Sequence, residues 1–299
     1  MSSVPVVPPT RAELEHEIAE LDADSLTVGS EGHRLHVLDY GGPSAVPALL
    51  LPGITSPAIA WGFMAARVTG VVRPYVMDLR GRGLSDCPRR GYALADYAGD
   101  VRRVVDELSL ERPVLVGHSL GARIAAAVAV EDPELARALV LIEPPLSGPG
   151  RPYPTSLTSF VDQLREAVGG CTAEDVRRHH PRWPLAELEL RARWLSSCAE
   201  HAVVETHRGF ERDQFMPLWR DLRTPLYLLY GAESPVLTAA DAKALAVANR
   251  SAECIAVPNA GHMVPWESPD TFAAILGGVL QIAVGADQPV NAIPTQRTI

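Results

Sequence analysis

The chain has 299 residues, of which 47% are hydrophobic and 21% are charged, a balance typical of a globular protein. Its formal net charge of -9 at pH 7 argues against nucleic acid and anionic membranes as partners, because these polyanions bind basic surfaces. No stretch reaches the roughly 20 consecutive apolar residues of a membrane span. Residues 1–9 lack the basic and apolar regions of a signal peptide. We therefore expect a cytoplasmic protein with neither a membrane nor a nucleic acid as partner.

The cysteines indicate reduced thiols rather than disulfides or a metal centre. Cys87, Cys171, Cys198 and Cys254 lie far apart in the sequence and form no C-x-x-C pair. Cys198 and His201 have helical spacing, but a zinc site needs further ligands that the sequence does not place nearby. We expect packed thiols and no metal.

The first predicted element is a short helix near the N-terminus. Thr10 and Glu13 have the spacing of a capping box, and Leu14, Ile18 and Leu21 follow on one helical face. We expect this apolar face to dock on the rest of the protein. A dimer contact through the same face is the alternative, so the sequence leaves a homodimer open.

Strand patterns then alternate with helical patterns along most of the chain. Strands are predicted at 25–29, 34–40, 48–51, 71–77, 113–116, 138–142, 225–230 and 254–257. Helices are predicted at 58–68, 97–108, 120–130 and 269–283. Such alternation is typical of an α/β fold, in which helices cover both faces of a mostly parallel sheet, here of eight strands.

One long segment interrupts this alternation. Residues 146–222 contain helical patterns, prolines and many of the aromatic residues, without a strand pattern. Because a structureless loop of this length is uncommon in a compact domain, we predict an inserted helical cap. The core would then comprise residues 1–145 and 223–284, and residues 285–299 are predicted to form a disordered tail.

The most informative motif is Gly117-His118-Ser119-Leu120-Gly121, which lies between an apolar strand pattern and a helix rich in small residues. G-x-S-x-G between a strand and a helix indicates a nucleophile elbow, a sharp turn that exposes the serine hydroxyl. The Leu120 N–H lies at a helix N-terminus, where it can face a developing oxyanion. The motif therefore predicts Ser119 as the nucleophile and Leu120 as an oxyanion donor.

An acyl-transfer serine needs a general base, and His262 is the strongest candidate among nine histidines. It follows the last predicted strand, where the chain order serine, acid, histidine places the base. The other histidines fall in helix, hairpin, strand or cap patterns. His118 occupies the variable position of the elbow, where we expect it to pack.

Two carboxylates compete for the role of the acid that orients the base. In enzymes with this chain order, the acid is commonly an aspartate after the seventh strand, and Ser234 occupies that position here. The neighbouring Glu233 lies one residue before it, so its side chain should point elsewhere. Glu143 follows the sixth strand, at the edge where the sites of open α/β sheets gather. We favour Glu143 and keep Glu233 as the alternative, while a solvated charge or an arginine partner is the non-catalytic interpretation of Glu143.

The remaining site residues are expected in two loops and in the cap. In Leu51-Pro52-Gly53-Ile54-Thr55, the Ile54 N–H is the second oxyanion donor and Thr55 is a substrate contact. At the start of the cap, Arg151 and Tyr153 are candidates to hold a substrate carboxylate. Arg123 is a further candidate, although an ion pair on the helix surface is the favoured interpretation of this residue. Apolar walls are expected from the cap aromatics, of which we select Trp194 as a substrate contact.

Together, the loop at 51–57, the turn at 78–85 (D-x-R-G-x-G-x-S), the elbow and the histidine loop at 259–267 resemble the α/β-hydrolase superfamily over residues 25–283. The stretches 51–63 and 144–154 look like N-formylmaleamate deformylases. The (acetamidomethylene)succinate hydrolases are similar in placing their acid after the sixth strand. Both relatives use aspartate there, whereas zearalenone-type lactonases pair a glutamate with serine and histidine, as Glu143 would here.

The resemblance implies a cofactor-free serine hydrolase that uses Ser119, His262 and Glu143 and forms an acyl-enzyme. The implied reaction is cleavage of the amide or formamide C–N bond of a small carboxylic acid. A carboxylesterase or lactonase is the alternative reaction. A ligand receptor that keeps the fold but not the turnover is a further alternative, because fold alone does not determine function.

Overall fold

Eight strands form a single sheet in the computed structural model, which describes residues 7–285. The strands are β1 Asp24–Val28, β2 Leu35–Asp39, β3 Pro47–Leu51, β4 Arg73–Met77, β5 Val114–His118, β6 Ala138–Ile142, β7 Leu226–Gly231 and β8 Ala252–Val257. Their order across the sheet is β1-β2-β4-β3-β5-β6-β7-β8. Only the β1–β2 and β2–β4 pairs of this described sheet are antiparallel, so the predicted mostly parallel, eight-stranded sheet is confirmed. The predicted tail falls outside the described residues except for Gly285, which ends the last helix.

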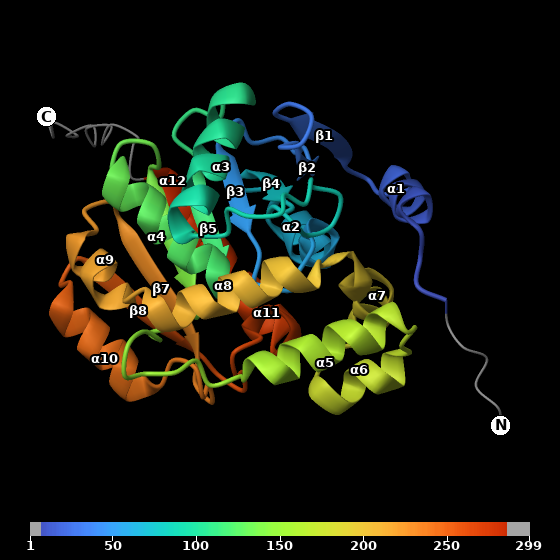
Figure 1. Ribbon diagram of the computed structural model, residues 1–299. Coiled ribbons are helices and arrows are strands. Elements are labelled where there is room, and N and C mark those ends of the chain that lie inside the picture. Colours follow the sequence, from blue (N-terminus) through green and yellow to red (C-terminus); the bar gives the residue numbers. More distant parts are fainter. Residues whose placement is uncertain (1–6, 286–299) are drawn as a thin grey trace, which may run out of the picture.

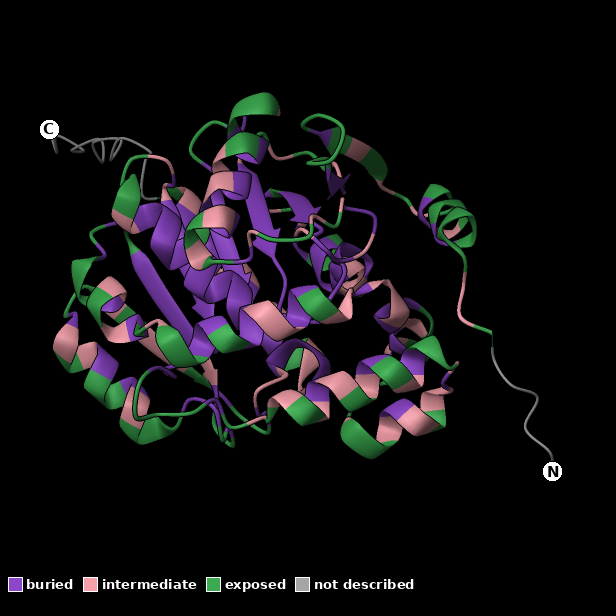
Figure 2. Cartoon of the chain, viewed as in Figure 1, coloured by how far each residue is buried: buried purple, intermediate pink, exposed green. Residues whose placement is uncertain are grey.

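Helices pack on both faces of this sheet (Figure 1). Those of the core are α1 Arg11–Ala19, η1 Ala58–Trp61 (a 3₁₀ helix), α2 Gly62–Val68, α3 Leu94–Glu107, α4 Leu120–Glu131, α10 Ala239–Ala248, α11 Val264–Glu267 and α12 Pro269–Gly285. Helix α3 packs against α4 on one face, and α2 packs against α12 on the other. The central strands β3, β5 and β6 are consequently buried along their whole length (Figure 2).

The regular elements of residues 146–222 are all helical. They are α5 Leu157–Val168, α6 Ala173–His179, α7 Leu185–Trp194, η2 Leu195–Ser197, α8 Glu200–Arg212 and α9 Phe215–Asp221. Helix α5 packs against α8, α6 packs against α7, and η2 contacts both α5 and α7, whereas α9 packs on α4 and α10 of the core. We call the segment with helices α5 to α8 the cap, which lies within the predicted cap at 146–222, and α9 leads the chain back to β7.

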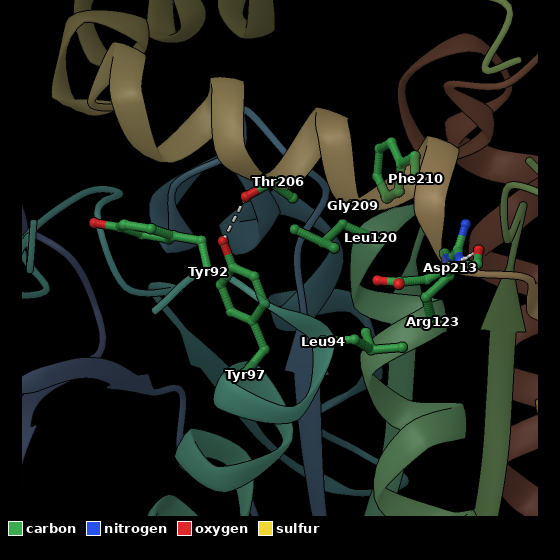
Figure 3. Close-up of a pocket in the computed structure, with 9 residues that line it drawn as sticks. All are labelled: Tyr92, Leu94, Tyr97, Leu120, Arg123, Thr206, Gly209, Phe210 and Asp213. Atoms are coloured by element: carbon green, nitrogen blue, oxygen red, sulfur yellow. Dashed lines mark hydrogen bonds between the residues drawn. The ribbon is translucent and has the colours of Figure 1, made fainter. Parts of the chain in front are cut away.

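A buried polar cluster joins the cap to the core (Figure 3). The hydroxyl oxygens of Tyr97 on α3 and Thr206 on α8 lie 2.6 Å apart. The buried guanidinium of Arg82 donates to both, at 2.7 Å and 3.0 Å, and to the carbonyl oxygen of Ile54 at 3.0 Å. Arg82 therefore fixes the position of the loop after β3 relative to the cap.

Two kinds of feature are absent from residues 7–285. No helix there combines the length and the apolar character needed to cross a bilayer. No group of three or more His, Cys, Asp and Glu side chains in that range is arranged to hold a metal ion.

Candidate active site

The G-x-S-x-G motif forms a sharp turn at the carboxyl end of β5. Ser119 has φ 54° and ψ -111°, between the last residue of β5 and the first residue of α4. A left-handed φ is uncommon for a non-glycine residue and marks a locally strained backbone. A Cβ added to Gly121 would lie 1.9 Å from the carbonyl oxygen of Leu51, so only glycine allows α4 to pass so close to β3.

The loop after β3 passes directly over this turn. A Cβ added to Gly53 would lie 3.6 Å from the Cβ of Ser119. The next residue in this loop is Ile54, whose carbonyl oxygen is held by Arg82. Ile54 and Leu120, the two expected oxyanion donors, are therefore on segments that flank Ser119.

Three side chains from different loops form a hydrogen-bonded chain. Ser119 Oγ lies 3.1 Å from His262 Nε2, and His262 Nδ1 lies 3.1 Å from Glu143 Oε2. These residues follow β5, β8 and β6, so the parallel strands bring them to one edge of the sheet. Burial lowers the pKa of His262 to about 4, which keeps the imidazole neutral at pH 7.

Glu143 is fully buried and accepts hydrogen bonds on both carboxylate oxygens. The Gly231 N–H donates to Oε1 at 2.8 Å, and the Ser234 hydroxyl donates to Oε2 at 2.6 Å. Burial raises the pKa of Glu143, and these two hydrogen bonds act in the opposite direction. With His262 Nδ1 as a third donor, the surroundings match an ionised carboxylate, which can only accept.

The alternative acid, Glu233, points to a different partner. Its carboxylate forms an ion pair with Arg182 at 2.7 Å, and its side chain is half exposed. The carboxylate that the structure places at His262 Nδ1 is that of Glu143. The sequence pattern marks Ser234 only as a position without a carboxylate, whereas in the structure its hydroxyl donates a hydrogen bond to Glu143.

His118 packs beside His262, as expected, and also contacts the backbone of that residue. Its ring lies against Trp61, Trp266 and the ring of His262. Its Nε2 lies 2.9 Å from the carbonyl oxygen of His262. Since burial lowers the pKa of His118 to about 3, its ring is neutral and Nε2 is the donor to this carbonyl. This hydrogen bond fixes the loop that carries His262.

A cavity of about 480 Å³ lies between the core and the cap, and His262 and His118 are part of its lining. This volume is in the range of small-molecule sites. Of the expected substrate contacts, Thr55 and Tyr153 line the cavity. The Tyr153 hydroxyl lies 3.3 Å from His262 Nε2, and burial raises the pKa of this phenol, so it remains a hydrogen-bond donor.

Two expected substrate contacts do not line this cavity. Arg151 is half exposed and forms an ion pair with Asp241 at 2.9 Å. Trp194 is buried, and its indole N–H donates to the carboxylate of Glu17 on α1 at 2.7 Å. The aromatic pattern of the cap could not reveal this contact, because the partner lies 177 positions away in the sequence.

Arg123, the further candidate for a substrate carboxylate, does not line this cavity but lies with Leu120 beneath α8 (Figure 3). Its guanidinium is buried and donates to backbone carbonyls, including that of Asp213, and to Ser147. The structure therefore assigns it to holding the start and end of the cap against α4.

Sequence reasoning missed the polar side chains that the cap contributes to the cavity, among them Gln163, His180, Arg182 and Arg191. A signal for Arg191 existed. Arg191 lies three residues after Leu188 and four residues before Leu195, on the buried face of α7. An arginine in an apolar stripe is unusual enough to indicate a special environment.

The contact of Trp194 leads to a prediction about stability. Replacing Trp194 with phenylalanine removes a hydrogen bond to a carboxylate, so we expect the free energy of unfolding to fall by about 1.5–3 kcal/mol. Trp219→Phe is the matched control, because its indole donates to the neutral carbonyl of Leu245 and should cost about 0.5–1.5 kcal/mol. Urea denaturation measures both, and equal losses would contradict the assignment of the Glu17 contact.

Residues 48–275 match the model of the Alpha/beta hydrolase family. The chain is 38% identical over 258 residues to the N-formylmaleamate deformylase of Pseudomonas putida, a match that covers 85% of this chain and 95% of the relative. It is 31% identical over 249 residues to the 2-(acetamidomethylene)succinate hydrolase of Mesorhizobium japonicum, covering 76% of this chain and 85% of the relative.

A solved structure agrees with these sequence matches. The crystal structure of the N-formylmaleamic acid deformylase from Pseudomonas putida S16 has a TM-score of 0.80 at 35% identity, covering 85% of this chain and all of that one. The deformylases and succinate hydrolases that the sequence resembled are thus confirmed as relatives, and the expected fold class is confirmed with them. The chain therefore belongs to the alpha/beta hydrolase family and is a hydrolase that acts on small molecules.

Proposed function

We propose that this protein is a serine hydrolase that cleaves the amide or formamide C–N bond of a small carboxylic acid through an acyl-enzyme. The observation that carries the proposal is the hydrogen-bonded chain from Ser119 Oγ through His262 to Glu143, with both links at 3.1 Å. Nucleophile, base and orienting acid are the three groups that acyl transfer requires of a serine enzyme.

The reaction begins with attack of Ser119 Oγ on the substrate carbonyl carbon. His262 Nε2 takes the hydroxyl proton, and Glu143 stabilises the imidazolium that forms. The N–H groups of Ile54 and Leu120 donate to the oxyanion. His262 then gives the proton to the leaving nitrogen, the C–N bond breaks, and the acyl group remains on Ser119. A water molecule, deprotonated by His262, hydrolyses this ester and restores the hydroxyl.

The names of the relatives support the C–N bond as the scissile one. The two curated relatives are described as a deformylase of N-formylmaleamate and a hydrolase of 2-(acetamidomethylene)succinate. Tyr153 lies at the place where the leaving group receives its proton, because its hydroxyl is 3.3 Å from His262 Nε2.

The proposal is tested with a fluorophosphonate probe and a substrate panel. We expect covalent labelling at Ser119, located by mass spectrometry of peptides, and turnover of N-formylmaleamate exceeding that of p-nitrophenyl acetate and of simple lactones. Labelling with turnover of esters or lactones alone would contradict the C–N bond and favour the esterase or lactonase alternative. A protein that neither labels nor turns over any substrate would instead be a ligand receptor.

Ser234 gives a prediction about pH dependence. Its hydroxyl lowers the pKa of Glu143, so replacing it with alanine should raise that pKa. Because the reaction needs the carboxylate form, the loss of kcat/KM on acidification should then begin at a higher pH than in the wild type. Ser234→Thr, which keeps the hydroxyl, is the control. A pH–rate profile that is identical in Ser234→Ala and wild type would contradict a positioning role for Ser234.

A further inference from the structure

The cap contributes a cation to the cavity that lacks an anionic partner. Arg191 on α7 lines the cavity, and its side chain is nine-tenths buried. Its guanidinium donates to the Thr55 carbonyl and hydroxyl oxygens, both at 3.3 Å, and to Gln163 Oε1 at 3.5 Å. All of these acceptors are neutral, and Arg191 Nε has no hydrogen-bond partner in residues 7–285.

The other titratable groups around the cavity do not supply that anion. Glu233 and Glu267 both pair with Arg182, which leaves this arginine compensated. Burial lowers the pKa of His180 to about 2, so that ring is neutral. No ion pair of Arg191 with an Asp or Glu exists within the described part of the chain.

A buried charge without a counterion is costly, and its removal from water is best compensated by a charge of opposite sign at hydrogen-bonding distance. The guanidinium plane suits a carboxylate, which it can bind through two parallel N–H donors. The position is also suitable, because Thr55 adjoins Ile54, the proposed oxyanion donor. A carboxylate at Arg191 would thus lie on the cap side of the reacting carbonyl.

We propose that Arg191 is the carboxylate-binding residue of this cavity and that it selects monoanionic ligands. This inference rests on the proposed function for its physiological meaning, since the carboxylate would be that of the substrate acid. Arg182 is already compensated by two glutamates, so a second carboxylate on the ligand would gain no comparable partner. The cavity should therefore distinguish a monoanion from a neutral molecule, but not prefer a dianion to a monoanion.

A purely structural role is the competing explanation. Arg191 joins α7 to the loop after β3 through Thr55, so its loss could loosen that loop without any effect specific to anions. The two roles differ in one measurable effect, because a loosened loop weakens the binding of charged and neutral ligands alike. If Arg191 binds the anion, its loss strongly weakens the binding of charged ligands only.

The test measures binding to the Ser119→Ala variant, in which turnover cannot interfere, by titration followed by NMR. The ligands are succinamide, succinamate and succinate, which share one carbon skeleton and carry zero, one and two negative charges. We expect succinamate to bind roughly 10- to 100-fold more tightly than succinamide, as for a hydrogen bond between charged groups. Succinate should bind no more tightly than succinamate.

Variants at Arg191 then separate the two roles. Arg191→Gln should abolish the preference for succinamate over succinamide, and Arg191→Lys should retain part of it as a point charge. Arg193→Gln is the matched control, because it removes a cation from the same helix at a position that does not line the cavity. It should leave the preference unchanged.

Several results would overturn the proposal. One is a preference for succinamate over succinamide that survives Arg191→Gln, and another is an equal loss of affinity for both ligands in that variant. A third is that succinamate binds the Ser119→Ala parent no more tightly than succinamide does, or does not bind at all. Because no step of this test requires catalysis, it can succeed even if the protein fails to hydrolyse amides. Conversely, if the protein hydrolyses amides but Arg191→Gln leaves the preference for succinamate unchanged, the proposed function stands and the role of Arg191 is refuted.

Discussion

Replacing Ser119 with alanine should lower kcat for hydrolysis by about 10⁶-fold, as the loss of a catalytic serine does in serine proteases. In the proposed reaction, the Ser119 hydroxyl oxygen forms the covalent bond to the substrate. Tyr153 also lies within reach of His262 Nε2, but its raised pKa keeps the phenol protonated and a poor nucleophile. The measurement is single-turnover hydrolysis, combined with a search for the acyl-enzyme by mass spectrometry.

The same substitution should change the free energy of unfolding little. Alanine loses the hydroxyl and its hydrogen bond to His262, which corresponds to about 0.5–1.5 kcal/mol. Ser159→Ala, which removes a different hydroxyl from the cavity wall, is the control and should keep most of the wild-type rate. A Ser119→Ala protein that hydrolyses substrate at the wild-type rate would refute the nucleophile assignment and the acyl-enzyme with it.

The parts of this site that sequence could predict are those encoded locally. The elbow is specified by five consecutive residues, and its turn depends on close backbone contacts that only glycine allows, as at Gly121. Glu143 and His262 each follow an apolar strand, and the parallel sheet brings strand ends together without further information. The strand patterns were clear for the same reason, since buried parallel strands are continuous apolar runs.

The cap contacts could not be predicted in the same way, because they depend on how helices far apart in sequence pack. Trp194 was expected in the cavity, but it faces α1, where Glu17 accepts its hydrogen bond. Arg151 was expected to bind a carboxylate and does so, but the carboxylate is that of Asp241. The charge and aromatic character of a cap residue indicate what it can bind, and only the packing decides the partner.

The acid illustrates how a local pattern can be informative and incomplete. The absence of aspartate at position 234 favoured Glu143 as the partner of His262, and the structure brings these two side chains together. The pattern did not reveal that Ser234 itself contacts the carboxylate. The two positions after β6 and β7 therefore act as one unit, in which one supplies the charge and the other supplies a donor that favours the charged form.

Replacing Glu143 with glutamine should lower kcat by roughly 10⁴-fold, the magnitude known for the same exchange of carboxylate for amide in a serine protease triad. Glutamine keeps the shape, but its amide carries no charge to stabilise the imidazolium, and its NH₂ group facing Nδ1 would stabilise the wrong tautomer of His262. The free energy of unfolding should stay constant or rise. Because burial raises the pKa of Glu143, the ionised carboxylate is costly in the folded protein, and a neutral amide removes that cost.

Glu233→Gln is the matched control for this exchange. Glu233 is one residue from the position that commonly holds the acid, but it is half exposed and paired with Arg182, which keeps a second partner in Glu267. An exposed ion pair of this kind contributes little, so activity and stability should both remain near the wild-type values. Steady-state kinetics of the two variants on one substrate decide between the carboxylates. If Glu233→Gln were the inactive variant and Glu143→Gln the active one, the base would be oriented from the end of β7, and the hydrogen bond between Glu143 and His262 would have no catalytic consequence.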